Sequence, residues 1–432
     1  MKTLMDCAAR TGAEFEIYFR SSFSRSVIIE NSELKGVESS MSSGVSLRLV
    51  KGGMSGVSFT KNLTDSVGLV ENAMASLRAG VEAKFSFPCF KQHAELKTYS
   101  EKAGKTSSED LLAESFRMRD LLSRMEGMQI NSGAQLFISQ CRLINSAGAD
   151  FAWEESSVEK YGSIISPGGS TYSAADRGFE LLPMPEAALD KVATLFDAEK
   201  SEVRPATGKR KILFMPSAME TLLWRVRSGA SGQSLHQSIS PLAGKIGEKV
   251  FSENLTLRNN PLDDSIPGAR YVDDEGVLCS DFALMEMGVF RGFYYDLNYA
   301  AKIGVPPTGH GFRRSMWGGD PIVLRPQPYL SHLCFDKGEK TFDALLREMG
   351  SGIVVFGTLG DHTGNIPNGD FSVGLSLGIC VENGRVVGKA KDTMVSGNIY
   401  DILKRVVAVG CEREPAYGNN PPILVDGVDV SN

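Results

Sequence analysis

The sequence predicts an α+β protein of two domains with a strand-rich second half. Its 432 residues exceed what one small hydrophobic core accommodates. In the first half, alternating apolar strands are interspersed with amphipathic helices, whereas strand and turn signals dominate beyond Gly229. A polar stretch containing Pro205 and Gly208 separates the halves. We therefore expect an N-terminal α+β domain with a mixed sheet and helices at residues 1–205, and a C-terminal domain with a barrel-like or curled antiparallel sheet at residues 206–432.

The first strands of the N-terminal domain are indicated by alternating apolar residues. Glu14–Phe19 predicts one strand, and Val27–Ile29 and Val45–Leu49 predict two more. Lys51-Gly52-Gly53 then predicts a hairpin turn into a strand at Gly56–Phe59. Further strands are expected from Gln135 onward, with a turn at Asn145–Gly148.

Three helices are expected in the same domain, at Thr64–Ala79, Ser108–Glu126 and Glu186–Ala198. The first two place apolar residues on one face at helical spacing. The residues of these faces are Val67, Val70, Met74 and Leu77 in the first helix and Leu111, Met118, Leu122 and Met125 in the second.

The C-terminal domain opens with a buried type of strand at Lys211–Met215. A helix follows Pro216, with apolar residues at positions i, i+3, i+4 and i+7 (Met219, Leu222, Leu223 and Val226). Hairpin turns are expected at Met287-Gly288 and at Asn383-Gly384. Many strands with few helices favour a curled sheet or a barrel.

Composition limits the function and location of the protein. The net charge of −6 and the pI near 5.6 argue against a large duplex-DNA footprint, because binding phosphates requires a basic face. The first residues lack the apolar run of a signal peptide, and no stretch approaches the roughly 20 apolar residues that span a bilayer. Seven dispersed cysteines without a C-x-x-C pair indicate reduced, buried and inert thiols. We expect a cytoplasmic protein.

The densest unusual segment is the loop at residues 357–372. It combines glycines with Asp, Asn and His between two apolar strands. Its backbone is able to approach a ligand closely, and its side chains can hydrogen-bond peptide groups. A turn cluster without a ligand is the alternative.

Two other arrangements of polar residues are possible sites. His236, His310 and His362 could form a metal site with Asp361 and Asp370, but none shows the helical pairing of a readable metal motif, so separate hydrogen-bonding histidines are favoured.

The segment Ser231–Ser240 contains hydroxyls and His236, but it has no nucleophile elbow. We expect a polar, mobile loop there. The acidic stretches at Asn260–Asp264 and Asp273–Gly276 match no calcium-loop spacing, so solvated turns are favoured.

Read in order, segments of the second half resemble the TldD/PmbA family, also called modulators of DNA gyrase. The first half resembles it more loosely. The segments that carry the resemblance are Gly244-Lys245-Ile246-Gly247-Glu248, Asn260-Pro261, Asp273-Asp274-Glu275-Gly276, Glu286-x-Gly288-Val289, Tyr294-Tyr295-Asp296, Thr308-Gly309, Gly369-Asp370-Phe371-Ser372-x-Gly374, Glu382-Asn383-Gly384, Ser396-Gly397-Asn398 and Leu424–Val428.

The family comprises two kinds of subunit that assemble together, and the resemblance implies which kind this chain is. The TldD kind has H-E-x-x-x-H on the first helix of its second domain, with a Cys near the C-terminus, as zinc ligands. The corresponding positions here read Trp224-Arg225-Val226-Arg227-Ser228-Gly229, and Cys411 lacks the family's Cys-Gly-Lys context. The chain therefore resembles the PmbA kind, also known as TldE, with no cofactor of its own and zinc expected in a TldD-like partner.

The resemblance further implies a cytosolic metalloprotease complex that degrades or processes unfolded and short peptides. No catalytic or metal-binding residue is expected in this chain. The loop residues expected to bind peptide are Gly360, Asp361, His362, Gly364, Asn365, Gly369, Asp370 and Ser372.

Three alternatives remain open from the sequence. One is a self-sufficient peptidase with an improvised site, and another is a non-proteolytic protein that modulates DNA gyrase. The third is a homodimer that only binds peptides.

Overall fold

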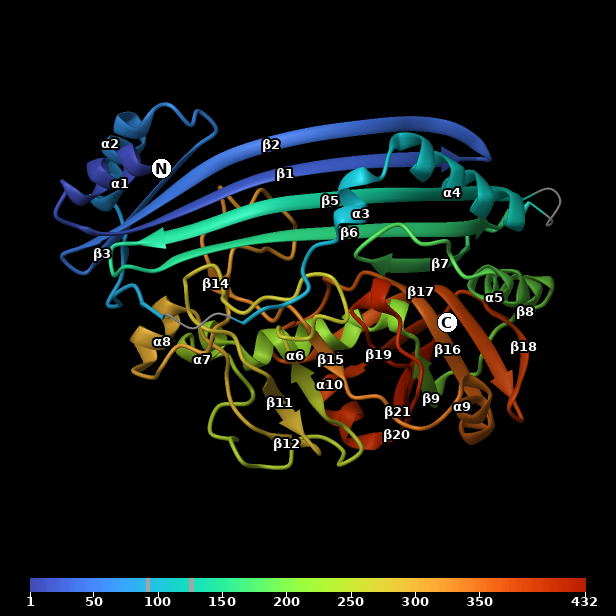
Figure 1. Ribbon diagram of the computed structural model, residues 1–432. Helices are drawn as coiled ribbons and strands as arrows, with labels where there is room; N and C mark the ends of the chain where they lie inside the picture. The colour runs from blue at the N-terminus through green and yellow to red at the C-terminus, as the bar shows by residue number, and fades with distance from the viewer. Residues whose placement is uncertain (91–93, 124–127) are drawn as a thin grey trace.

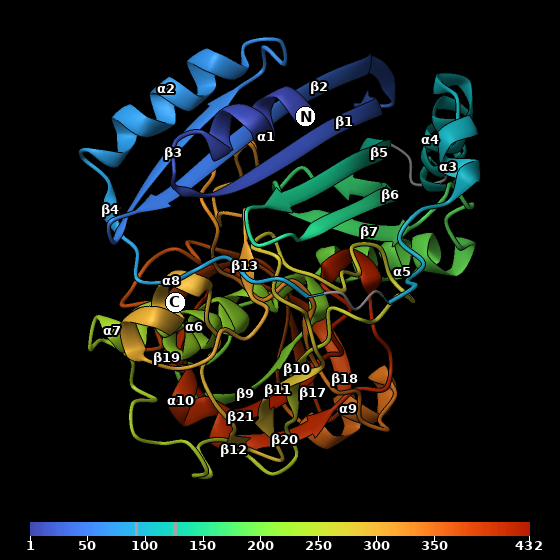
Figure 2. The ribbon, with the colours of Figure 1, turned by 60° about the vertical axis from the view of Figure 1, so that its left-hand side comes forward.

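The computed structural model describes residues 1–90, 94–123 and 128–432. A long curved sheet from the first half arches over the second half of the chain (Figures 1 and 2). All strands of this sheet lie between residues 14 and 178, and the strands of the other sheets lie between 202 and 431. The division into domains at residues 205 and 206 stays a prediction, but this distribution of strands agrees with it.

The first sheet has seven strands in the order β4-β3-β2-β1-β5-β6-β7. All of its neighbouring strands are antiparallel, so the mixed pairing expected here does not occur in it. Its strands are β1 (Glu14–Glu30), β2 (Glu33–Lys51), β3 (Met54–Thr60), β4 (Val81–Glu82), β5 (Gln129–Asn145), β6 (Asp150–Ile165) and β7 (Thr171–Gly178).

Two tight turns set the register of the first three strands. The predicted turn at Gly52-Gly53 is confirmed, with φ of 59° and 75°. An unpredicted turn lies at Asn31-Ser32, where φ is 52° and 66°. Positive φ at both central residues is the signature of hairpin turns that match strand twist. Because the turn at Asn31-Ser32 comes only after Glu30, the two strands predicted at Glu14–Phe19 and Val27–Ile29 are one strand.

Helices cover the sheet at both ends. At one end, α1 (Lys2–Ala9) and α2 (Ser66–Leu77) pack on Phe15, Ile17 and Leu47. The helix at α2 is confirmed, and of its predicted face Val70, Met74 and Leu77 pack on this core, whereas Val67 is 58% exposed.

At the other end lie α3 (Glu101–Lys105) and α4 (Ser108–Leu122). Leu111, Met118 and Leu122 are buried, as predicted. The predicted end of this helix, with Met125 and Glu126, lies outside the described residues. The helix predicted at Glu186–Ala198 is α5 (Glu186–Phe196), which continues into a 3-10 turn at Asp197–Lys200.

Five strands of the second half close into a barrel. Around the ring they are β9 (Gly208–Phe214), β21 (Ile423–Ser431), β19 (Met394–Asn398), β17 (Asp370–Glu382) and β16 (Gly352–Leu359). Strand β16 closes the ring, since it pairs antiparallel with β17 and parallel with β9. The barrel-like architecture is confirmed, and mixed pairing is found here.

Smaller elements surround the barrel. A 3-10 turn at Pro216–Ala218 leads into α6 (Glu220–Ala230), whose residues Leu222, Leu223 and Val226 are buried in the main core, as predicted. The other elements are β8 (Glu202–Val203), α7 (Gly232–His236), β10 (Leu257–Asn259), β11 (Phe282–Glu286), β12 (Val289–Phe290), α8 (Leu297–Ile303), β13 (Gly311–Phe312), β14 (Gln327–Pro328), β15 (Leu333–Phe335), α9 (Phe342–Met349), β18 (Arg385–Ala390), α10 (Ile399–Ile402), β20 (Val406–Val409) and the 3-10 turns Leu403–Arg405 and Pro415–Tyr417. Among the described residues, no helix combines the length and apolar character needed to cross a bilayer.

The two halves are joined by buried ion pairs. On β1, Glu16 is fully buried and accepts hydrogen bonds from Arg48 at 2.7 Å and from Arg313 at 2.8 Å. Arg48 also donates to Glu275 at 2.6 Å. Glu16 and Arg48 belong to the first sheet, whereas Arg313 and Glu275 belong to the second half. These charges therefore hold the sheet to the turns beneath it.

The acidic turn at Asp273–Gly276 is part of this buried junction, so the prediction of a solvated turn is wrong. Asp273, Asp274 and Glu275 are between 0% and 4% exposed. The Asp273 carboxylate accepts three backbone N–H groups, from residues 275, 277 and 311. Burial raises the pKa of both Asp273 and Glu275. Sequence spacing did not reveal that Arg48, from the distant strand β2, pairs with this turn.

Asp296 gives this junction a dependence on pH. Its buried carboxylate caps α8 by accepting the N–H of Tyr299 at 2.7 Å. Burial, and then the negative charge of Glu275, raise the pKa of Asp296 to about 8. The unfolded value is about 3.9. The folded state therefore binds this proton more tightly, and the contribution of Asp296 to stability becomes less favourable as pH rises from about 4 to about 8.

We expect Asp296→Asn to lose less unfolding free energy than the parent protein between about pH 5 and pH 8, because asparagine keeps the cap without the charge. Urea unfolding at both pH values measures the difference. Equal losses in the two proteins would show that Asp296 ionises normally.

Candidate functional site

The loop between β16 and β17 lies against helix α6, and this junction contains all the residues predicted to bind a peptide. Residues 360–369 connect the two strands, and Asp370 and Ser372 begin β17. The junction is centred on Arg225, the fifth residue before the end of α6 at Ala230.

Arg225 holds the loop by its carbonyl groups. The side chain is fully buried. Its guanidinium donates to the carbonyl oxygens of Asp370 at 2.7 Å, Thr363 at 2.8 Å and Asp361 at 3.1 Å, and to Thr221 of its own helix at 2.8 Å. Burial lowers the pKa of Arg225, although the nearby charges of Asp361 and Asp370 oppose this shift. One side chain therefore fixes both ends of the loop.

Two carboxylates tie the loop to its neighbours. The Asp361 carboxylate accepts hydrogen bonds from the hydroxyls of Thr221 at 2.6 Å and Thr358 at 2.9 Å. The Asp370 carboxylate accepts from the amides of Asn398 at 2.8 Å and Asn368 at 3.1 Å. Each carboxylate accepts hydrogen bonds from neutral donors. These bonds orient the loop without bringing a further positive charge to it.

The outer surface of the loop is open. His362, Gly364, Asn365 and Ser372 are exposed. In the part of the chain that the structure describes, the backbone N–H groups of His362, Gly364 and Asn365 donate no hydrogen bond. Exposed backbone donors of this kind are what an extended peptide pairs with.

Aromatic rings border the open surface. Trp317 is 77% exposed, and its ring lies 5.9 Å from the ring of Trp224 on α6 and 6.3 Å from that of His362. Such rings supply apolar area for peptide side chains. No local pattern indicates Trp317 or Arg225, because each meets the loop from a segment that is distant in the chain.

Gly229, one turn after Arg225, provides space for Tyr400. A β-carbon at position 229 would collide with the Tyr400 hydroxyl. This hydroxyl is buried and has no hydrogen-bond partner within the described residues. A larger side chain at position 229 would require Tyr400 to move.

The histidines do not come together. His310 is buried between Thr308 and Asn259, and burial lowers its pKa to about 4. His236 packs on Tyr299, and His362 packs on Trp317. Across residues 1–90, 94–123 and 128–432, no three His, Cys, Asp or Glu side chains are grouped to hold a metal ion. The alternative of a histidine metal site therefore gains no support.

The segment after α6 is not the mobile loop that we predicted. Residues Gly232–His236 form α7, which Ser231 caps by accepting the N–H of Ser234 at 3.1 Å. The Ser231 hydroxyl donates to Ser228 O and Ser234 Oγ, so it is engaged in local structure.

The cysteines are only partly as expected. Cys141, Cys279 and Cys380 are buried, and burial raises their pKa values, to about 11 for Cys141 and Cys380. Cys89 is exposed, contrary to the prediction of buried thiols.

The geometry defines a class of α+β protein in which a curved antiparallel sheet covers a small closed barrel and a polar loop is anchored on the helix after the first barrel strand. The family model of the PmbA/TldA metallopeptidase C-terminal domain matches residues 207–432, and the model of metallopeptidase domain 1 matches residues 15–84. The chain belongs to the PmbA/TldA metallopeptidase family, which is the TldD/PmbA family indicated by the sequence motifs.

Relatives align along nearly the whole chain. The metalloprotease PmbA homolog of Haemophilus influenzae is 24% identical, and the alignment covers 99% of this chain and 94% of that protein. A metalloprotease of Methanothermobacter thermautotrophicus is 25% identical over 90% of this chain and 86% of its own length. Among solved structures, TldE from Thermococcus kodakarensis has a TM-score of 0.91 at 22% identity, with 100% of both chains covered. This last likeness shows the shared fold.

Proposed function

We propose that this chain is the PmbA/TldE-like subunit of a cytosolic TldD/TldE-type metalloprotease complex that degrades or processes unfolded and short peptides. In this proposal the chain has no zinc site of its own and contributes peptide binding and assembly. A TldD-like partner supplies the zinc.

The residues at positions 224–229 of α6 are the observation that carries this proposal. The family's zinc motif corresponds to positions 224–229, and no imidazole or carboxylate is present there. Arg225, a fixed cation, is buried where a metal would need negative or neutral ligands. Gly229 is closely covered by Tyr400, so a second ligand would not fit without rearrangement. The donor set therefore does not fit zinc.

The open loop supports a role in peptide binding. Arg225 donates hydrogen bonds to the loop carbonyls from the buried side. Backbone N–H groups are therefore left on the outer surface, beside Trp317 and His362. Pairing with an extended backbone depends little on side-chain sequence, as the recognition of unfolded peptides requires.

The test is reconstitution with the TldD-like subunit of the same host. We expect this chain to copurify with that subunit and the pair to cleave an unstructured fluorogenic peptide in a chelator-sensitive manner, whereas this chain alone does not cleave it. Within the pair, His362→Ala together with Asp370→Asn is expected to raise the KM several-fold. Unchanged cleavage by this variant would remove the loop from the proposal, and cleavage by the chain alone would favour a self-sufficient peptidase.

A further inference from the structure

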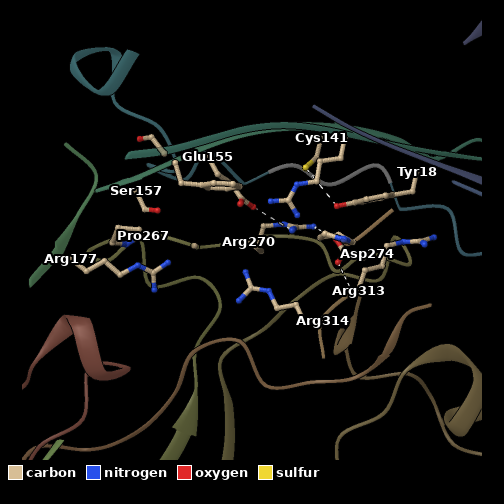
Figure 3. Close-up of a pocket in the computed structure, with 15 residues that line it drawn as sticks. Tyr18, Cys141, Glu155, Ser157, Arg177, Pro267, Arg270, Asp274, Arg313 and Arg314 are labelled. Atoms are coloured by element: carbon tan, nitrogen blue, oxygen red, sulfur yellow. Dashed lines mark hydrogen bonds and ion pairs between the residues drawn. The ribbon is translucent and has the colours of Figure 1, made fainter. Parts of the chain in front are cut away.

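A cavity of about 100 Å³ lies between the inner face of the first sheet and two segments of the second half (Figure 3). The sheet contributes residues from β1, β5, β6 and β7, and the second half contributes residues 267–274 and 313–321. The cavity is separate from the loop site, since it shares no residue with it. Its charged lining consists of Arg20, Arg177, Arg270, Arg313, Arg314, Glu155 and Asp274.

Two of the five arginines are neutralised by structural ion pairs. Arg270 pairs with Asp274 at 2.9 Å and with Glu155 at 3.4 Å. Arg313 donates to Glu16 at 2.8 Å. These two guanidinium groups form part of the junction between the halves, and both acidic residues that line the cavity, Glu155 and Asp274, pair with Arg270.

The remaining arginines carry an excess of positive charge. In the described part of the chain, the guanidinium groups of Arg20, which is half-buried, and of Arg314, which is exposed at the mouth of the cavity, have neither a hydrogen-bonding acceptor nor an ion-pair partner. Arg177 has one ion pair, which its Nε makes with a carboxylate oxygen of Glu159 at 3.1 Å. Figure 3 shows the heads of Arg177 and Arg314 pointing toward one another beneath Arg270.

The approach of like charges is unfavourable in the unliganded protein. Burial lowers the pKa of Arg177, the negative charge of Glu159 opposes this shift, and the positive charge of Arg314 adds to it. The same two arginines, after burial, lower the pKa of His332, whose ring lies beside Gly268 at the cavity wall. The Nε2 atom of His332 is buried without a hydrogen-bond partner. An anion between these groups would relieve the repulsion between Arg177 and Arg314 and would supply a hydrogen-bond acceptor for Nε2 of His332.

We propose that this cavity binds the carboxylate group of a peptide. The volume of about 100 Å³ is sufficient for one carboxylate head. Guanidinium groups match carboxylates through paired N–H donors. The carboxylate comes from a peptide C-terminus or from an Asp or Glu side chain. The inference rests on the proposed function only in taking the ligand to be a peptide.

The cavity lies within reach of the loop site. Residues 313–321 line the cavity through Arg313, Arg314 and Pro321, and Trp317 of the same segment contacts His362. The α-carbons of Arg314 and Trp317 are at most about 11 Å apart, because each residue extends the chain by no more than about 3.6 Å. A peptide whose carboxylate is bound in the cavity would run along this segment toward the loop.

Calorimetric titration of the full chain with N-acetylglycinate and with the neutral N-acetylglycinamide, at matched ionic strength, tests the cavity directly. We expect the carboxylate to bind and the amide to bind at least about tenfold more weakly. Arg20→Gln with Arg314→Gln is expected to weaken carboxylate binding about tenfold, and it breaks no ion pair found among the described residues. Arg347→Gln on α9, an exposed arginine, is the control and is expected to leave binding unchanged.

Equal binding of the two compounds, or equal carboxylate binding by the parent and the double variant, would overturn the proposal. Three otherwise identical peptides identify the source: one with a free C-terminus, one amidated, and one amidated with an internal Glu. The peptide that binds the double variant more weakly than it binds the parent contains the carboxylate that the cavity recognises. If the chain binds the carboxylate but the complex cleaves no peptide, the proposed function is wrong and the cavity proposal stands. If the complex cleaves peptides but the chain shows no preference for the carboxylate, the cavity proposal is wrong and the proposed function stands.

Discussion

Replacing Arg225 by methionine is expected to disorder the loop at residues 360–369 and to abolish most peptide cleavage by the reconstituted complex. Methionine fills similar space but donates no hydrogen bond. The carbonyl groups of Asp361, Thr363 and Asp370 then lose their shared donor. Each unsatisfied buried acceptor costs about 1–3 kcal/mol, so the free energy of unfolding is expected to fall by roughly 3 kcal/mol unless the loop opens to water. Hydrogen exchange would reveal such opening as faster exchange in residues 360–372.

Arg347→Met is the matched control, because Arg347 is an exposed arginine on another helix of the same half. We expect its unfolding midpoint and its exchange pattern to be those of the parent. If Arg225→Met left both the loop exchange and the peptide cleavage unchanged, the guanidinium would not be what holds the site.

Replacing Glu16 by glutamine is expected to destabilise the protein as a whole. The neutral amide would leave Arg48 and Arg313 buried without the carboxylate that both of them contact. Breaking a buried ion pair from one side costs about 3–5 kcal/mol, because a charge remains in a poorly solvated place. Denaturant unfolding of the full chain measures this loss, and the second half is expected to loosen along with the sheet.

Glu286→Gln provides the comparison for this prediction. Glu286 pairs with Arg291 at 2.7 Å, but both side chains are nearly half exposed. Exposed pairs contribute about 0–1 kcal/mol, so this variant is expected to stay close to the parent. Similar losses for the two variants would mean that burial of the Glu16 cluster does not determine its contribution.

The features predicted correctly from sequence depend on neighbours along the chain. The turn at Gly52-Gly53 needs only two residues tolerant of positive φ, and α6 shows its apolar face within one helical period. Of the face predicted for α2, Val70 is buried and Met74 and Leu77 pack against the core under the sheet, whereas Val67 is exposed. The edge of a buried helix face depends on the surface on which the helix packs.

The site was predictable only in part for the same reason. The composition of residues 357–372 marked a loop with unusual backbone demands, and the structure gathers those residues on α6. The anchor, Arg225, and the bordering Trp317 are distant in sequence from the loop. The acidic turn at Asp273–Gly276 looked solvated, since its partners Arg48 and Arg313 come from other segments. Local patterns thus identify which residues are unusual, whereas tertiary contacts decide what they do.

The zinc content of the isolated chain, purified after expression in zinc-supplemented medium, tests most directly the claim that α6 holds an arginine in place of a metal. Mass spectrometry under native conditions is expected to show the metal-free mass, and the same preparation is expected to leave an unstructured peptide intact. One zinc retained per chain through dialysis, together with cleavage of that peptide, would contradict the account.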